Sequence, residues 1–309
     1  MGRFVLPEAV LARARAFGAE GEAWAAGLDD LVASLERDWQ ISVGASMSGG
    51  THAFVAPAVG ADGEKYVLKV DVPDMSVDDY MNEVRTLQLA GGEGFVRVFR
   101  VDSARRATLQ ERLGPRLAEM GWPVRRQIEI LCAALLRTWK IPAGGVKLSD
   151  GADSVAWFRG FIPEAWESLG RPCPKRVIDR AMEYLDAREA KLDPARYVLV
   201  HGDVHNNNAL QSLDDPAQFK LIDPDGIFYE PGYDLGVLMR EWPEEYEAEP
   251  VRMGRERAAL LSRLTGADEE SILHWGYLQT VSTSLVLLQI GGTELAQKML
   301  KTAEAWLEI

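Results

Sequence analysis

The 309-residue sequence predicts an α+β fold of two lobes, a small β-rich N-lobe and a larger helical C-lobe. Strand-like alternation and hairpin turns concentrate in residues 41–111, whereas helical spacing of apolar residues dominates after residue 124. One strand–loop–strand pattern, residues 197–222, interrupts the helical part. Such segregation indicates α+β rather than alternating α/β architecture. We therefore expect two domains, 1–112 and 113–309, with helices over residues 1–40 at the start of the first.

The composition is ordinary for a soluble globular protein, with 47% hydrophobic and 26% charged residues. No apolar run is long enough for a bilayer, and the N-terminus lacks the shape of a secretion signal. Cys132 and Cys173 lack metal-ligand spacing and are expected as free thiols. We expect a cytoplasmic protein, a monomer or weak dimer. The net charge of −13 argues against nucleic acid and suits a cationic small-molecule substrate, although it also serves solubility.

In the first lobe, residues 41–70 predict strands joined by two turns. The first turn is Ser48-Gly49-Gly50-Thr51, and the second is a hairpin at Asp62-Gly63. In a nucleotide-binding protein, Ser48, Gly49 and Gly50 would fold over the phosphates and donate backbone N–H groups. A plain hairpin would need the same residues.

A lysine within an apolar strand and a glutamate on an apolar helix face are the next candidates. Lys69 lies in Lys65–Val70, where an unpaired buried ammonium would be costly. Ser76 can cap a helix through about Ala90, and Glu83 shares its apolar face with Tyr80 and Leu87. A strand lysine that pairs with a helix glutamate positions nucleotide phosphates in kinases. Taken alone, Lys69 could be a solvated edge residue.

After a hairpin over residues 96–111, the chain crosses to the second lobe near Glu111-Arg112-Leu113. The backbone of Glu111 to Leu113 could pair with an adenine edge, or it could be a simple linker. Helices are expected over residues 124–139, 157–169, 176–192, 235–241, 251–265, 270–290 and 294–307.

The most informative stretch is His201-Gly-Asp203-Val-His205-Asn-Asn-Asn208, followed by Asp223 in Leu-Ile-Asp-Pro. Asp203 would accept the proton of an acceptor hydroxyl, while Asn208 and Asp223 would hold the metal ions that bridge nucleotide phosphates. Asp and Asn are also common turn residues, but the spacing and the flanking strands favour a phosphotransferase site. Asp234 begins the next helix. It could cap that helix, or it could brace the catalytic loop by accepting backbone N–H bonds; we favour the structural role, which does not exclude the bracing one.

These motifs, with Gly232-Tyr-Asp-Leu235, resemble the aminoglycoside phosphotransferases, most closely the streptomycin 6-kinase and hydroxyurea kinase branch. The resemblance implies a bilobal protein-kinase-like fold, ATP or GTP as donor and Mg²⁺ as cofactor. It matches Asp203 to the catalytic base, Asn208 and Asp223 to the metal ligands, and Lys69 with Glu83 to the phosphate-positioning pair. The candidate acids for a cationic substrate are Asp225, Glu230 and Glu241, whereas Glu244 and Glu245 are expected on a solvated face.

Three functions remain open at this point. The first is an aminoglycoside kinase acting on streptomycin, which would give antibiotic resistance by O-phosphorylation. The second is a kinase of another small hydroxyl compound, such as hydroxyurea, a peptide antibiotic or a metabolite. The third is a non-catalytic nucleotide-binding module, which an intact set of catalytic residues disfavours.

Overall fold

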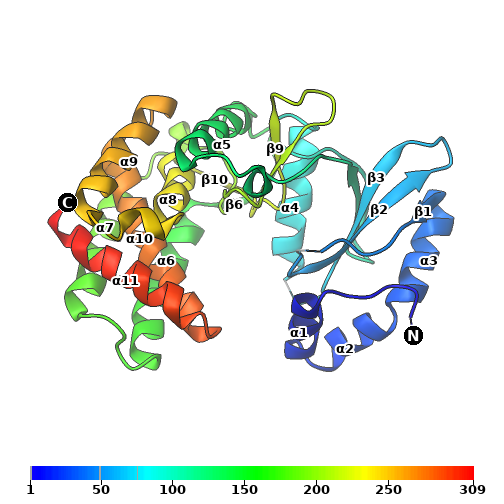
Figure 1. Ribbon diagram of the computed structural model, residues 1–309, viewed down its shortest axis with the longest axis horizontal. Helices are drawn as coiled ribbons and strands as arrows, with labels where there is room; N and C mark the ends of the chain where they lie inside the picture. Colours follow the sequence, from blue (N-terminus) through cyan, green and yellow to red (C-terminus); the bar gives the residue numbers. More distant parts are fainter. Residues whose placement is uncertain (1, 49, 75) are drawn as a thin grey trace. The chain divides into compact units, whose positions relative to one another are not determined.

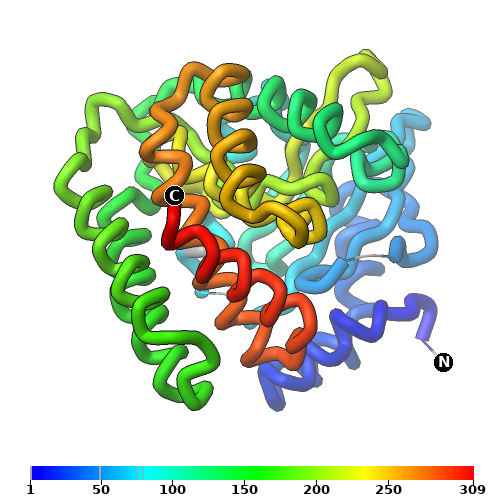
Figure 2. Tube along the Cα trace, turned by 60° about the vertical axis from the view of Figure 1, so that its left-hand side comes forward, coloured from blue at the N-terminus to red at the C-terminus, as the bar shows by residue number. Residues whose placement is uncertain are grey.

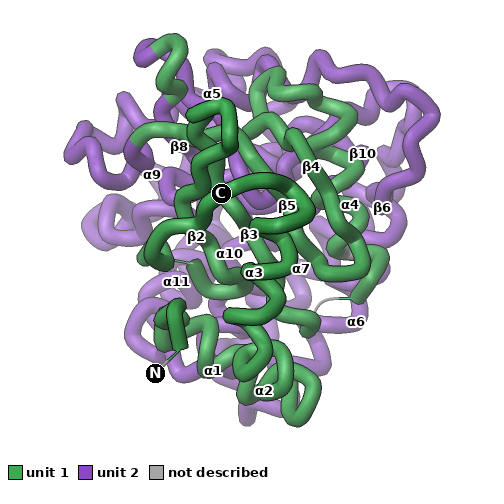
Figure 3. Tube along the Cα trace, turned by 90° about the vertical axis from the view of Figure 1, so that its right-hand side faces the viewer, with its two compact units in different colours: residues 1–114, 212–215 green, residues 115–211, 216–309 purple. Residues whose placement is uncertain are grey.

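The computed structural model describes residues 2–48, 50–74 and 76–309 and divides the chain into two compact units. Unit 1 comprises residues 1–114 with 212–215, and unit 2 comprises residues 115–211 with 216–309 (Figures 1 and 3). Within these described ranges, no helix combines the length and apolar character needed to cross a membrane.

Unit 1 is built around a five-stranded antiparallel sheet in the order β1-β2-β3-β5-β4. Apolar side chains of the N-terminal helices, such as Val32 and Leu35, form one core with Phe54, Leu68 and Leu109 of the sheet. The elements are α1 (Glu8–Ala16), α2 (Ala19–Ala26), α3 (Leu28–Trp39), β1 (Ile41–Val43), β2 (Ala53–Gly60), β3 (Lys65–Asp71), α4 (Val77–Ala90), β4 (Val98–Asp102) and β5 (Ala107–Glu111).

The turns predicted in unit 1 join the expected strands. The Ser48–Thr51 segment connects β1 to β2, and Gly49 lies outside the described residues. Asp62-Gly63 connects β2 to β3, with Gly63 at φ +84°, a backbone conformation that favours glycine.

Unit 2 is mainly helical and is centred on α10, which packs against α6, α7, α8, α9 and α11. Trp275 of α10 is fully buried, and Figure 2 shows α11, in red, lying along α10, in orange. The helices are α5 (Val124–Thr138), α6 (Gly151–Ser168), α7 (Lys175–Glu189), α8 (Gly232–Arg240), α9 (Pro250–Thr265), α10 (Glu269–Gln289) and α11 (Thr293–Ala305), with short 3₁₀ turns at Leu117–Met120, Pro194–Arg196, Pro243–Tyr246 and Trp306–Glu308.

Two small sheets carry the loops of unit 2 that hold the predicted catalytic residues. One has the order β6-β10-β7, formed by Ser149–Asp150, Ile227–Tyr229 and Val198–Val200. The other is the hairpin of β8 (Ala209–Gln211) and β9 (Phe219–Leu221). The sequence analysis predicted the strands β7 and β9, whereas β6, β8 and β10, which are two, three and three residues long, were not predicted.

Close contact between α8 and α10 depends on two glycines. A Cβ atom added at Gly236 would lie 2.6 Å from Cβ of Trp275, and one added at Gly276 would lie 2.6 Å from Cβ of Met239. The two helices can therefore pack backbone against backbone, which fixes the C-terminal end of α8, where Arg240 lies.

Candidate active site

The catalytic loop, residues 201–208, joins β7 to β8 and is anchored by a buried histidine. The amide of Asp203 donates to Nδ1 of His201 (3.2 Å), so Nε2 carries the proton that it donates to Ile222 O (2.8 Å). Burial lowers the pKa of His201 to about 4, which keeps the ring neutral. His201 therefore holds the loop.

Asp234 braces the same loop from α8. Its carboxylate accepts hydrogen bonds from the backbone N–H groups of His201 (3.1 Å) and Gly202 (2.9 Å) and from Nε1 of Trp139 (2.9 Å). Pro231 is the residue at the N-cap of α8, and no side chain in the described part of the chain caps that helix. Of the two roles considered for Asp234, capping of α8 is therefore wrong and bracing of the catalytic loop is confirmed, because backbone donors of that loop occupy its oxygens.

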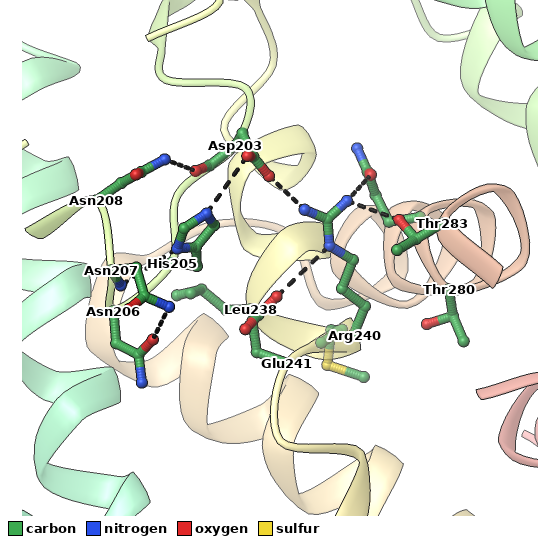
Figure 4. Close-up of polar contacts among 12 residues, drawn as sticks. Asp203, His205, Asn206, Asn207, Asn208, Leu238, Arg240, Glu241, Thr280 and Thr283 are labelled. Atoms are coloured by element: carbon green, nitrogen blue, oxygen red, sulfur yellow. Dashed lines mark hydrogen bonds and ion pairs between the residues drawn. The ribbon is translucent and has the colours of Figure 1, made fainter. Parts of the chain in front are cut away.

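Asp203 is held by a guanidinium and an imidazole (Figure 4). Arg240 Nη2 donates to Oδ1, and His205 Nε2 lies 3.4 Å from Oδ2. Burial alone would raise the pKa of Asp203, but the hydrogen bond from His205 and the charge of Arg240 hold it well below its usual value. In turn, contact with Asp203 raises the pKa of His205 against the opposing effect of burial. Asp203 is thus an ionised carboxylate, the form that can accept a proton.

The sequence analysis missed Arg240. Its guanidinium is fixed by Gln279 Oε1 (2.9 Å) and Thr283 Oγ1 (2.8 Å) of α10, and its Nε lies 3.7 Å from Oε1 of Glu241 (Figure 4). The signal available in the sequence was a charged residue directly after the apolar run Leu235–Met239, all of which is buried. A cation at the end of a buried helix needs anionic or polar partners.

Asn208 directly precedes β8 and Asp223 lies two residues beyond β9, so both are at the same end of the β8–β9 hairpin. Ala209 pairs with Leu221, and the next backbone bond joins Ile222 N to Asn208 O (2.9 Å). Asn208 Nδ2 donates to Asp203 O (3.1 Å), which leaves Oδ1 as the amide atom that could bind a cation. Amide and carboxylate oxygens are suitable ligands for Mg²⁺, which takes few protein ligands when phosphates complete its shell. These donors therefore fit a magnesium ion.

In unit 1, the predicted contact between Lys69 and Glu83 is confirmed. Lys69 Nζ donates to Glu83 Oε1 (2.5 Å) and lies 3.4 Å from Oδ1 of Asp71, and each of the three residues is at most 7% exposed. Leu68 and Val70 point into the core shared with α3, so the two-residue period of β3 directs Lys69 to the opposite face, where Glu83 of α4 meets it.

The other residues predicted for nucleotide binding lie at the ends of strands of unit 1. Ser48 is exposed and Gly50 half-buried in the β1–β2 turn. Glu111 is the last residue of β5, and its N–H donates to Arg97 O (2.8 Å), so this N–H is engaged within the unit. Leu113 is buried just beyond it. Their roles in binding a nucleotide stay predictions.

The three candidate substrate acids have different surroundings. Asp225 is exposed and packs against Gly202, where an added Cβ would lie 2.4 Å from Oδ2. Glu241 is half-buried beside Arg240, and burial raises its pKa. Both oxygens of Glu230 already accept hydrogen bonds, from Ser271 Oγ and Trp275 Nε1. These bonds give Glu230 a structural function, and its contact with substrate stays a prediction.

The two acids expected on a solvated face divide between two situations. Glu244 is exposed, as expected. Glu245 instead pairs with the buried Arg257. It therefore has a structural partner rather than a purely solvated position.

A braced loop that presents a carboxylate, followed by a hairpin that ends in a second one, is how kinase folds prepare a hydroxyl for phosphorylation. Together with the β-rich and helical units, it defines a protein-kinase-like phosphotransferase that acts on hydroxyl groups. A family model described as aminoglycoside/hydroxyurea antibiotic resistance kinase matches residues 38–291. The chain belongs to this family, which confirms the resemblance read from its motifs.

Relatives of the chain agree with this membership. Streptomycin 6-kinase of Streptomyces glaucescens is 28% identical over 97% of this chain and 96% of its own length. Hydroxyurea phosphotransferase of Kitasatospora aureofaciens is 27% identical over 97% of this chain and 85% of its own. Among solved structures, an aminoglycoside phosphotransferase of Streptomyces rimosus in complex with ADP and streptomycin matches with a TM-score of 0.53 and 17% identity, covering 82% of this chain and 98% of that one. The last comparison supports the fold.

Proposed function

We propose that this protein transfers the γ-phosphate of ATP to a hydroxyl of an aminoglycoside, with streptomycin as the first acceptor to test. The observation that carries the proposal is the Asp203 carboxylate, kept ionised by Arg240 and His205 on a loop braced by Asp234. Support comes from the relative named streptomycin 6-kinase and from the structural neighbour bound to ADP and streptomycin. The net charge of −13 suits a polycationic acceptor.

In the proposed reaction, the acceptor oxygen attacks the γ-phosphorus while the bond from this phosphorus to the oxygen bridging the β- and γ-phosphates breaks, and ADP leaves. The hydroxyl proton passes to Asp203, which the His205 and Arg240 contacts hold in place. In unit 1, Lys69 would bind the phosphates with its ammonium held by Glu83. Ser48 and Gly50 would donate backbone N–H groups, and the segment from Glu111 to Leu113 would contact the base.

Two protein oxygen donors would hold the metal. The pairing of β8 with β9 brings Asn208, directly before β8, and Asp223, two residues beyond β9, to one end of the hairpin. Mg²⁺ bound there would neutralise charge on the phosphate oxygens. We assign residues 1–112 to nucleotide binding and residues 113–309 to catalysis and acceptor binding.

The test is a phosphate-transfer screen with purified protein, ATP or GTP, and a panel of aminoglycosides, with mass spectrometry of the product. We expect a mass increase of one phosphoryl group on streptomycin. Absence of transfer to every aminoglycoside, while a known aminoglycoside kinase is active in the same assay, would exclude the proposed acceptor class. Nucleotide binding without transfer to any acceptor would indicate a non-catalytic module.

A hydroxyurea kinase is the second candidate, because the two relatives differ by only one percentage point of identity, 28% and 27%. Both candidates use the same proton acceptor and metal ligands and differ only in acceptor recognition. Hydroxyurea is neutral, so it would not gain the charge attraction that an acidic side chain such as Glu241 offers to a cation. Including hydroxyurea in the screen separates the two.

A further inference from the structure

Unit 2 contains a cavity of about 630 Å³ that includes none of the described residues assigned to proton transfer or metal binding, although one of the candidate substrate acids, Glu230, lines it. Its walls come from the end of α7 and the following segment, from the end of β10 with the start of α8, and from the α9–α10 connection. Among the described residues that line it, neither Asp203, Asn208 nor Asp223 is present. Cavities of 300–1,000 Å³ are typical for small-molecule ligands.

Two nitrogen atoms of a buried arginine in the wall have no hydrogen-bond acceptor. Arg188 is 3% exposed, and neither Nε nor Nη1 has a hydrogen-bond partner in the described part of the chain. Nε lies 3.1 Å from Oε1 of Glu230, but without hydrogen-bond alignment, and that oxygen already accepts from Trp275. Nη1 lies 3.9 Å from Oδ2 of Asp268, which accepts from Ser271 N. Buried N–H groups are almost always satisfied, so two of them on one side chain call for an acceptor.

A second buried hydrogen-bond donor in the wall also lacks an acceptor. The hydroxyl of Tyr229 has no hydrogen-bond partner among the described residues, although the side chain is fully buried and lines the cavity. Its ring is fixed by Tyr197, Tyr233 and Trp275 at centroid distances of 5.3–5.4 Å. The hydroxyl therefore cannot turn to solvent without repacking these rings.

Among its described residues, the wall has three cationic side chains and three carboxylates, and its hydrogen-bond donors rather than its net charge favour an anion as the occupant. Its three carboxylates already have protein donors: Glu230 from Ser271 and Trp275, Asp268 from Ser271 N, and Asp193 from Ala195 N. Arg196 also lines the cavity, is exposed, and forms no ion pair with any described residue. The described side chains of the wall that still lack a hydrogen-bond or ion-pair partner are thus hydrogen-bond donors.

We propose that this cavity binds a small oxyanion, a phosphate or carboxylate group, through Arg188, Tyr229 and Arg196. The planar guanidinium suits both groups, since each presents two oxygens at matching separation. Trp139, which donates to Asp234, forms part of the wall. An occupant would therefore lie against a side chain that helps to hold the catalytic loop.

The test uses the full-length protein, titrated with inorganic phosphate and with citrate against sodium chloride of matched ionic strength. Binding is followed by calorimetry and by the melting temperature. We expect phosphate, citrate or both to bind and to raise the melting temperature, and the pair of probes separates phosphoryl from carboxylate ligands. If neither anion differs from chloride, the cavity holds water and the proposal is overturned.

Variants assign the binding to the cavity. Tyr229→Phe removes only an unpartnered hydroxyl, so it should stay folded and weaken anion binding about tenfold, the loss of one good hydrogen bond. Arg196→Ala should weaken it several-fold, and Arg188→Gln should abolish it if the protein folds. Arg252→Gln, on the exposed face of α9, is the matched control and should bind as wild type. Unchanged binding in both Tyr229→Phe and Arg196→Ala would place the anion elsewhere and overturn the proposal.

Discussion

Arg240 Nη2 donates to Oδ1 of Asp203, so the side chain proposed to accept the substrate proton is ion-paired to the last residue of α8. Gln279 and Thr283 hold the same guanidinium from α10. Because two helices fix the cation, the carboxylate has little freedom to rotate. We infer that Arg240 is a positioning residue that sets both the orientation of Asp203 and its charge.

Replacing Arg240 should change the pH profile as well as the rate. Burial raises the pKa of Asp203 and the charge of Arg240 opposes it, so Arg240→Met should raise that pKa by leaving the effect of burial less opposed. Activity requires the ionised carboxylate, and the acidic limb of kcat/KM should therefore move to higher pH. We expect a 10- to 100-fold lower kcat at neutral pH, measured by steady-state kinetics from pH 4 to 8.

Arg240→Lys is the informative control, because it keeps the charge but not the planar fork of donors. It should restore the position of the acidic limb while recovering only part of the rate. An Arg240→Met enzyme with the pH profile of wild type would show that Arg240 is purely structural.

Removing the proposed proton acceptor should separate chemistry from nucleotide binding. Asp203→Ala should lower kcat by 10²- to 10⁴-fold and leave the Kd for nucleotide within about threefold. Asp223→Ala should weaken magnesium-dependent nucleotide binding as well, because its carboxylate is assigned to the metal. Transfer assays and calorimetry with and without Mg²⁺ measure both effects. Near-normal turnover in Asp203→Ala would refute the assigned role.

Asp234 should contribute to stability through its three donors. In Asp234→Asn, one acceptor oxygen becomes an NH₂ group that faces N–H donors from His201, Gly202 or Trp139. Leaving buried donors without an acceptor costs about 1–3 kcal/mol each, so denaturant unfolding should show a loss of this size. Turnover should also fall, since the loop loses its brace. A variant as stable as wild type would contradict these contacts.

Sequence patterns predicted the parts of the structure that depend on interactions between residues close together in the chain. Apolar periodicity gave α5, α9 and α10 nearly to the residue. The pairing of Lys69 with Glu83 could be predicted because a strand and the next helix carry them only fourteen positions apart. Each residue would be costly in an apolar environment without the other.

What depends on packing between distant segments could not be predicted. Asp203 and Arg240 are thirty-seven positions apart and meet only because α8 packs closely on α10. An aspartate in the first turn of a helix gives the same sequence pattern whether it caps that helix or braces another loop, so the sequence left both roles of Asp234 open. Strands β6 and β10 pair across more than seventy residues and carry no pattern of their own.

The Lys69–Glu83 pair can be tested by a double-mutant cycle. Lys69→Met removes the ammonium that pairs with Glu83 in a buried site, which typically costs about 3–5 kcal/mol, whereas Glu83→Gln should cost less because Asp71 remains 3.4 Å from Lys69. The double variant should be less destabilised than the sum of the two, and Lys69→Met should also raise the KM for ATP. The exposed pair Lys175–Asp179 is the matched control, for which changes should stay below about 1 kcal/mol. Additive effects at Lys69 and Glu83 would argue against a coupled pair.

Glu241 should distinguish a cationic from a neutral acceptor. It is half-buried next to Arg240, so its carboxylate is partly accessible to a cation bound beside it, and removing its negative charge should matter to such a cation. Glu241→Gln should raise the KM for streptomycin about tenfold with little change in kcat, and should leave transfer to hydroxyurea unaffected. Glu244→Gln, three positions along and exposed, is the control and should leave both acceptors unaffected. Equal losses with the two acceptors would mean that Glu241 acts through Arg240 and Asp203 rather than by contact with the acceptor.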